Sequence, residues 1–178
     1  MIDSKIKLIA SEASPSSPAF SIKDFVVIGM SDDANEGFLY GEDIYDYPPI
    51  APSQRFSNIF INHQDWLNSV DNNGNLIESP RFITDIRPFN DAVQWNISGE
   101  FLGAGSSSQI RLDWIIDGDM GGDIKLVVNG REPIDMLTSS FVDDLNPEEF
   151  QNFSVQIGGV LSNDDFSINE FRIDNLYP

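Results

Sequence analysis

The sequence predicts an all-β protein: an antiparallel β-sandwich of about eight strands, Ig-like or jelly-roll-like, with a flexible N-terminal arm. Short apolar or alternating runs recur along the chain and are separated by turn-forming residues. No segment keeps a helical apolar period for more than about one turn. The length of 178 residues fits a single folded domain.

We expect one folded domain between two tails. Residues 1–20 read as a flexible arm or linker, because SEASPSSPA (11–19) is rich in Ser and Pro. The preceding SKIKLIAS could supply an added strand. Residues 21–160 form the predicted sandwich, and residues 161–178 are expected to be a C-terminal strand or linker.

Alternating and apolar runs mark the strands in order. They are FSIKDFVVIG (20–29), FSNIFIN (56–62), VQWNISG (93–99), QIRLDWII (109–116), IKLVVNG (124–130), NFSVQIG (152–158) and DFSINEFRI (165–173). In QIRLDWII, the side chains of Ile110, Leu112 and Trp114 share one face, as in a half-buried antiparallel strand. DNNGN (71–75) carries the Asn-Gly pair of a hairpin turn, and NPEEF (146–150) could form one helical turn.

The charge balance excludes several classes of partner. The chain has 29 acidic and 10 basic residues, a net charge of −19, and no basic block. It is therefore not expected to bind nucleic acid or an anionic membrane surface. With no cysteine, it can form neither disulfides nor thiolate metal sites. No apolar run is long enough for a membrane helix, so no membrane insertion is expected.

Several short motifs follow one another along the chain. They are DDANEGFLYGEDIYDYPPIAP (32–52), HQDW (63–66), RFITDIR (81–87), VQWNIS (93–98), IRLDW (110–114), EPIDM (132–136) and NFSVQIG (152–158). In this order, over residues 25–157, they resemble a β-sandwich module of large secreted and surface proteins from bacteria with a type IX secretion system. DDFSINEFRIDNLYP (164–178) is similar to the entry of a C-terminal type IX sorting domain. The resemblance implies a secreted, extracellular or cell-surface protein whose sorting domain has been removed.

The stretch SPRFITDIRPF (79–89) places two arginines around an acid in a chain that is short of positive charge. Asp85 lies two residues from both Arg81 and Arg87, so its carboxylate could pair with either guanidinium. One interpretation is a site for a carboxylate or a sugar hydroxyl. The favoured interpretation is a charged cluster that ties an edge strand to a neighbouring loop.

Two acidic loops are candidate Ca²⁺ sites, because carboxylates in flexible glycine-containing loops can converge on a hard cation. The predicted ligands are Asp32, Asp33, Glu36 and Asp43 in the first loop, and Asp117, Asp119 and Asp123 in the second. The first loop is favoured because it coincides with the acidic segment of the resembling module. The alternative is that both loops are solvated acidic turns.

Aromatic residues suggest a carbohydrate platform. Trp66 has polar neighbours in NHQDWLN, and Tyr40, Tyr45 and Tyr47 are close in sequence to one another. Together they could present a flat surface to sugar rings. The alternative, which the resemblance favours, is that Trp66 packs beneath a loop.

Catalysis finds little support in the sequence. His63 is the single histidine and no nucleophile elbow is present, so the expectation is a non-catalytic protein. The first functional hypothesis is a module that binds a polysaccharide or another cell-surface component, with Ca²⁺ as a potential stabiliser. The second is a structural subunit that self-associates by adding its N-terminal strand to a neighbour's sheet edge.

Overall fold

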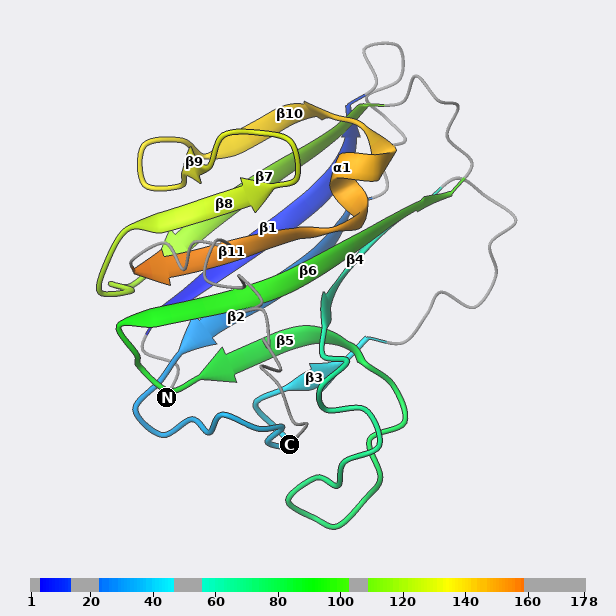
Figure 1. The fold of residues 1–178 in the computed structure, drawn as a ribbon, viewed down its shortest axis with the longest axis vertical. Helices are drawn as coiled ribbons and strands as arrows, with labels where there is room; N and C mark the ends of the chain where they lie inside the picture. Colours follow the sequence, from blue (N-terminus) through cyan, green and yellow to red (C-terminus); the bar gives the residue numbers. More distant parts are fainter. Residues whose placement is uncertain (1–3, 14–22, 47–55, 103–108, 159–178) are drawn as a thin grey trace, which may run out of the picture.

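The computed structural model describes residues 4–13, 23–46, 56–102 and 109–158 (Figure 1). The predicted all-β class is confirmed, since the described chain contains eleven strands and one short helix. The elements are β1 (Ser4–Ala13), β2 (Asp24–Met30), β3 (Ile44–Tyr45), β4 (Phe56–Asn62), β5 (Arg81–Arg87), β6 (Ala92–Leu102), β7 (Gln109–Asp117), β8 (Ile124–Val128), β9 (Ile134–Asp135), β10 (Phe141–Leu145), α1 (Pro147–Gln151) and β11 (Phe153–Gly158).

The strands form one curled sheet, a half-barrel, in place of two separate sheets (Figure 1). Their order is β10-β7-β1-β2-β5-β4-β6-β11-β8-β9, with β3 added on β5. Every pairing is antiparallel except that of β2 with β5, which is parallel. This parallel pair joins the two antiparallel halves, and the twist of the sheet brings those halves face to face around the core.

The first strand corrects the expected N-terminal arm. Residues 4–13 are not an arm but the inner strand β1, which pairs with β2 on one edge and with β7 on the other. Its inward side chains Ile6, Leu8 and Ala10 are fully buried. Both edges of β1 are therefore used within the chain, which leaves neither edge free for a neighbour's sheet. Residues 14–20 of the expected arm, and residues 161–178, lie outside the described residues.

The core follows the alternation that the sequence shows. Ile110, Leu112 and Trp114 on β7 are buried together, as predicted, and Trp95 and Ile97 on β6 belong to the same buried core. Alternating strands can bury one face in this way because successive side chains point to opposite sides of the sheet.

The predicted helical turn closes one end of the core. Asn146 caps α1 by accepting hydrogen bonds from the backbone N–H groups of Glu148 and Glu149, and Glu149 completes a capping box. The helix buries Phe150 against Gly99 of β6, where any larger side chain would collide with the phenyl ring. Glycine is therefore required at position 99.

The predicted hairpin at residues 71–75 is also present. The backbone N–H of Asp71 donates to the carbonyl of Asn75 (2.8 Å), and Val70 pairs with Leu76. Gly74 adopts φ 82°, a left-handed conformation that favours glycine. The Asp71 carboxylate accepts hydrogen bonds from the backbone of Asn73 and Asn75, which fixes the turn.

Shortening a side chain of β1 tests its position in the core. We expect Leu8→Ala to lower the free energy of unfolding by about 2–5 kcal/mol, because it leaves a cavity at a fully buried site. The control is Ile9→Ala, one residue away on the outer face, which should cost clearly less. Urea denaturation of both variants gives the comparison, and equal losses would contradict an inner β1.

Candidate functional site

The Asp85 carboxylate lies at the centre of a buried charged network on β5. Its Oδ2 accepts a hydrogen bond from Nε of Arg87 (2.9 Å) and lies 2.8 Å from Nε2 of His63. Arg87 also donates from a terminal nitrogen to the carbonyl of Gln94 (2.9 Å). Asp85 is fully buried and the His63 side chain nearly so. The network therefore ties β5 to the segment after β4 and to β6.

Arg81 belongs to a separate cluster. Its Nε donates to Asp46 (3.2 Å) and a terminal nitrogen to Glu100 (3.0 Å), while the guanidinium lies over the Phe60 ring at 3.8 Å. Of the two arginines considered for Asp85, the structure pairs only Arg87 with it. Both arginines pair with carboxylates of the protein itself, which agrees with the scaffold interpretation, although one terminal nitrogen of Arg81 is buried without a hydrogen-bond partner.

The predicted aromatic platform is divided between the interior and the surface. Trp66 is only 8% exposed and stacks on the His63 ring, with centroids 3.5 Å apart. Tyr45 stacks on Phe82, so it packs in the same aromatic cluster. Tyr40 is 67% exposed, and Tyr47 lies outside the described residues. Trp66 therefore packs beneath its loop, and Tyr40 is the described member of the set with a ring free to meet a ligand.

The candidate calcium ligands do not converge. In the first loop Asp32, Asp33 and Glu36 are exposed, whereas Asp43 is buried. In the second loop each carboxylate has a different neighbour: Asp117 faces Lys5 (3.5 Å), Asp119 accepts from the N–H of Gly121 (2.9 Å), and Asp123 faces Lys125 (4.0 Å). Within the described ranges, no three His, Asp or Glu side chains are placed to hold a metal ion. Calcium binding stays a prediction.

Asp43 instead anchors the loop that precedes β3. Its Oδ2 accepts from the N–H of Leu39 (2.7 Å), and its Oδ1 accepts from the N–H of Ile86 on β5 (3.0 Å). Burial raises the pKa of the Asp43 carboxyl to about 6, and these two N–H groups oppose that shift. The neighbouring charge of Asp85 raises the pKa further, while His63 lowers it. The residues on either side, Glu42 and Ile44, are thereby held over β5.

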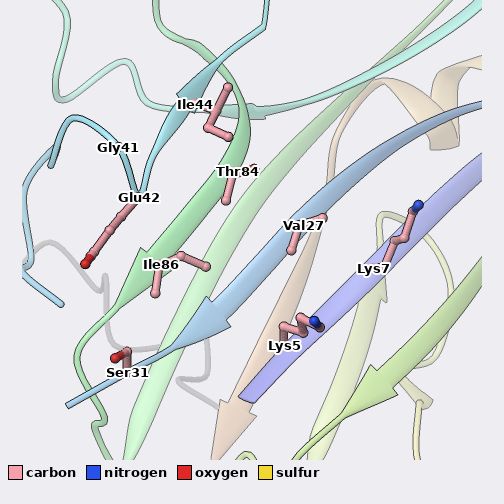
Figure 2. A pocket seen from close by; sticks show the side chains of 9 residues that line it. All are labelled: Lys5, Lys7, Val27, Ser31, Gly41, Glu42, Ile44, Thr84 and Ile86. Atoms are coloured by element: carbon pink, nitrogen blue, oxygen red, sulfur yellow. The ribbon is translucent and has the colours of Figure 1, made fainter. Parts of the chain in front are cut away.

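The sheet and this loop line an open pocket of about 520 Å³ that the sequence did not reveal (Figure 2). It is lined by Lys5, Lys7, Val27, Ser31, Gly41, Glu42, Ile44, Thr84 and Ile86. Figure 2 shows the two lysines on β1 at one side and the loop with Glu42 at the other. The apolar side chains of Val27 and Ile86 lie between them. The pocket thus has an apolar floor and charged groups at both walls.

The register of three strands explains why the pocket exists. Lys7, Val27 and Thr84 lie in one row across β1, β2 and β5, and Lys5, Gly29 and Ile86 lie in the next. Gly29 has no side chain, so the second row has a gap between its lysine and its isoleucine. A shift of β2 by one residue against its neighbours would turn each of its side chains to the other face of the sheet. The gap at Gly29 therefore lies beside the loop only in a register that keeps the observed faces.

A second hollow, also about 520 Å³, lies over β4, β6, β8 and β11. Its lining is richer in neutral amides, including Asn62, Asn96, Asn129 and Asn152. Its cation, Arg131, is already held by Glu149 through two hydrogen bonds (2.6 and 2.8 Å). Among the described residues that line it, the second hollow therefore has no cation that is free for a ligand.

Comparison with protein-family models, with curated proteins and with solved structures finds no match. No helix in the described part of the chain is long and apolar enough to cross a membrane.

The buried Asp43 predicts a pH dependence of stability. Because the pKa of Asp43 is raised in the folded state above its ordinary value of 3.8, its contribution to stability is fully present at low pH and is lost as the pH rises through about 6. We expect the free energy of unfolding to rise by about 1.4 kcal/mol from this group between pH 7 and pH 5. Asp43→Asn should remove that increment, whereas Asp117→Asn at an exposed site should retain it. Denaturation at both pH values measures it, and an unchanged slope in Asp43→Asn would contradict the assignment.

The positions of the aromatic side chains predict a large loss of stability for one substitution and a small one for another. Trp66→Ala should lower the free energy of unfolding by about 3–5 kcal/mol, since it removes a buried indole and its stack on His63. Tyr40→Ala should change stability by less than about 0.5 kcal/mol, because that ring is exposed. Thermal and urea unfolding give both values. A stable Trp66→Ala protein would restore Trp66 as a candidate ligand platform.

Proposed function

We propose that this protein is a non-catalytic extracellular or cell-surface module that binds a segment of polysaccharide in the pocket over β1, β2 and β5. The observation that carries the proposal is the combination in one open pocket of an apolar floor with cationic, anionic and hydroxyl groups. Small-molecule sites typically combine apolar walls with a few placed polar groups.

The lining matches the two kinds of surface that a sugar ring presents. Val27, Ile44 and Ile86 can cover the C–H face of a ring. The Thr84 hydroxyl can donate to or accept from the hydroxyls of the sugar, and the Glu42 carboxylate can accept from them. Tyr40 immediately precedes the loop residues of the wall and is exposed. An aromatic ring at this rim could stack on the next sugar unit of a polymer.

The ionisable groups near the pocket support binding rather than turnover. Hydrolysis of a glycosidic bond generally uses two carboxyl groups that flank it. Among the nine lining residues, Glu42 is the one carboxylate. Asp43 lies next in the chain, but both of its oxygens accept hydrogen bonds from the backbone beneath the loop. The pocket therefore offers a hydrogen-bonding carboxylate without an acid–base partner.

The location proposed is outside the cell. A net charge of −19 without cysteine suits a soluble protein that folds without disulfides, and the resemblance to type IX secretion cargo favours the same location. Calcium remains a proposed stabiliser of the acidic loops. Self-association is the alternative role, and the inner position of β1 does not favour it in this fold.

A steric exchange in the pocket tests the proposal. A glycan array should identify a bound oligosaccharide, and Val27→Phe should weaken its binding at least about tenfold, because the larger ring fills the floor between the lysines and the loop. Val127→Phe is the matched control, since Val127 is a half-buried valine that lines the second hollow. Calorimetry measures both affinities. Absence of any bound glycan, or a loss with Val127→Phe alone, would overturn the proposal.

A further inference from the structure

We infer that the saccharide bound in this pocket contains a uronic acid, and that Lys7 together with Lys5 holds its carboxylate. The inference rests on the proposed function and specifies its ligand. It starts from the placement of positive charge in a chain with only 10 basic residues.

Most of the described basic side chains are committed to carboxylates of the protein. The pairs are Arg81 with Asp46 and Glu100, Arg87 with Asp85, Arg111 with Asp113, Arg131 with Glu149, Lys125 with Asp123 and Lys5 with Asp117. Within the part of the chain that the structure describes, Lys7 and Lys23 form no such pair, and of these two Lys7 is the one that lines the pocket. Its Nζ lies over the Phe25 ring at 3.9 Å. An unpaired cation in so acidic a protein, placed on a pocket wall, favours an anionic ligand.

Lys5 lies beside Lys7 and can add a second contact. The two residues are separated by one position on β1, so their Cα atoms are about 7 Å apart and their side chains project from the same face. The Lys5 ammonium faces Asp117 at 3.5 Å, with side chains 49% and 71% exposed. An exposed pair of this kind is weak, so its cation can turn to a ligand. A carboxylate has two oxygens and can bridge both ammonium groups.

The opposite wall fixes the direction in which the ligand lies. Figure 2 shows Glu42 across the pocket from β1, with its carboxylate directed away from the lysines. The negative charge of the Glu42 carboxylate repels an acidic group, and its oxygens can accept hydrogen bonds from hydroxyls. The carboxylate of the sugar therefore lies at the β1 side, and neutral hydroxyls lie at the loop side. A neutral saccharide would complement only the wall with Glu42, and a uniformly sulfated saccharide would complement only the wall with the lysines.

The negative net charge of the protein repels an acidic polysaccharide at long range, but this repulsion does not prevent close contact with the lysines of the pocket. The Debye length is about 8 Å at physiological ionic strength, so acidic side chains far from the pocket are largely screened. Contacts of the ligand with Lys7 at hydrogen-bond distance are screened much less. Short oligosaccharides at physiological salt therefore report on the pocket itself.

The test compares acidic sugars with their neutral esters. Calorimetry would measure trisaccharides of galacturonate, glucuronate and mannuronate, each alongside its methyl ester, with a sulfated trisaccharide as a further probe. We expect at least one uronate to bind about five- to tenfold more tightly than its own ester. Lys7→Met keeps the apolar stem but removes the charge, so it should abolish this preference. Lys125→Met on β8 is the control and should retain it.

The outcomes separate this inference from the proposed function. Equal binding of uronates and esters, or stronger binding of the sulfated probe, would overturn the carboxylate assignment while leaving a saccharide site that Val27→Phe still blocks. A preference that survives in Lys7→Met would also overturn it. Failure of every probe and every array glycan to bind would remove the proposed function itself.

Discussion

The pairing of β1 with both β2 and β7 is the constraint on which the structure depends. Strands β7 and β10 reach the rest of the sheet through β1, so one side of the half-barrel exists only while this strand is in place. Its two faces have different tasks. Ile6 and Leu8 point inward and complete the core, whereas Lys5 and Lys7 point outward and form a wall of the pocket. A single alternating strand thus links stability to the candidate site.

The other wall depends on the aromatic packing around Phe82 of β5, which is part of the hydrophobic core. Phe82 is covered there by Phe38, Tyr45 and Trp66, which pack at centroid distances between 4.9 and 5.4 Å from its ring. Asp43 adds two hydrogen bonds that fix the loop to the strand. Because the loop is held at several points, the pocket is formed before any ligand arrives, and binding does not need to order it.

Local patterns allowed part of this structure to be predicted. Alternation at Ile110, Leu112 and Trp114, the Asn-Gly turn at residues 71–75 and the helical turn at NPEEF depend on neighbouring residues, and all three are present. Features that depend on distant pairing were not predictable. The Ser/Pro-rich segment after β1 resembles a linker, although β1 is an inner strand. The pocket follows from the register that places Gly29 between Lys5 and Ile86, which no local pattern specifies.

The inner position of β1 also governs how the chain can be made. Lys5 pairs with Asp117, so during synthesis the strand emerges long before its second partner exists. Until β7 leaves the ribosome, only one edge of β1 can be paired, and the sheet cannot close on the core. Non-local pairings of this kind fold slowly, because the loop between them must be ordered before the contacts stabilise it. A newly made chain is therefore expected to fold more slowly than one built from local hairpins.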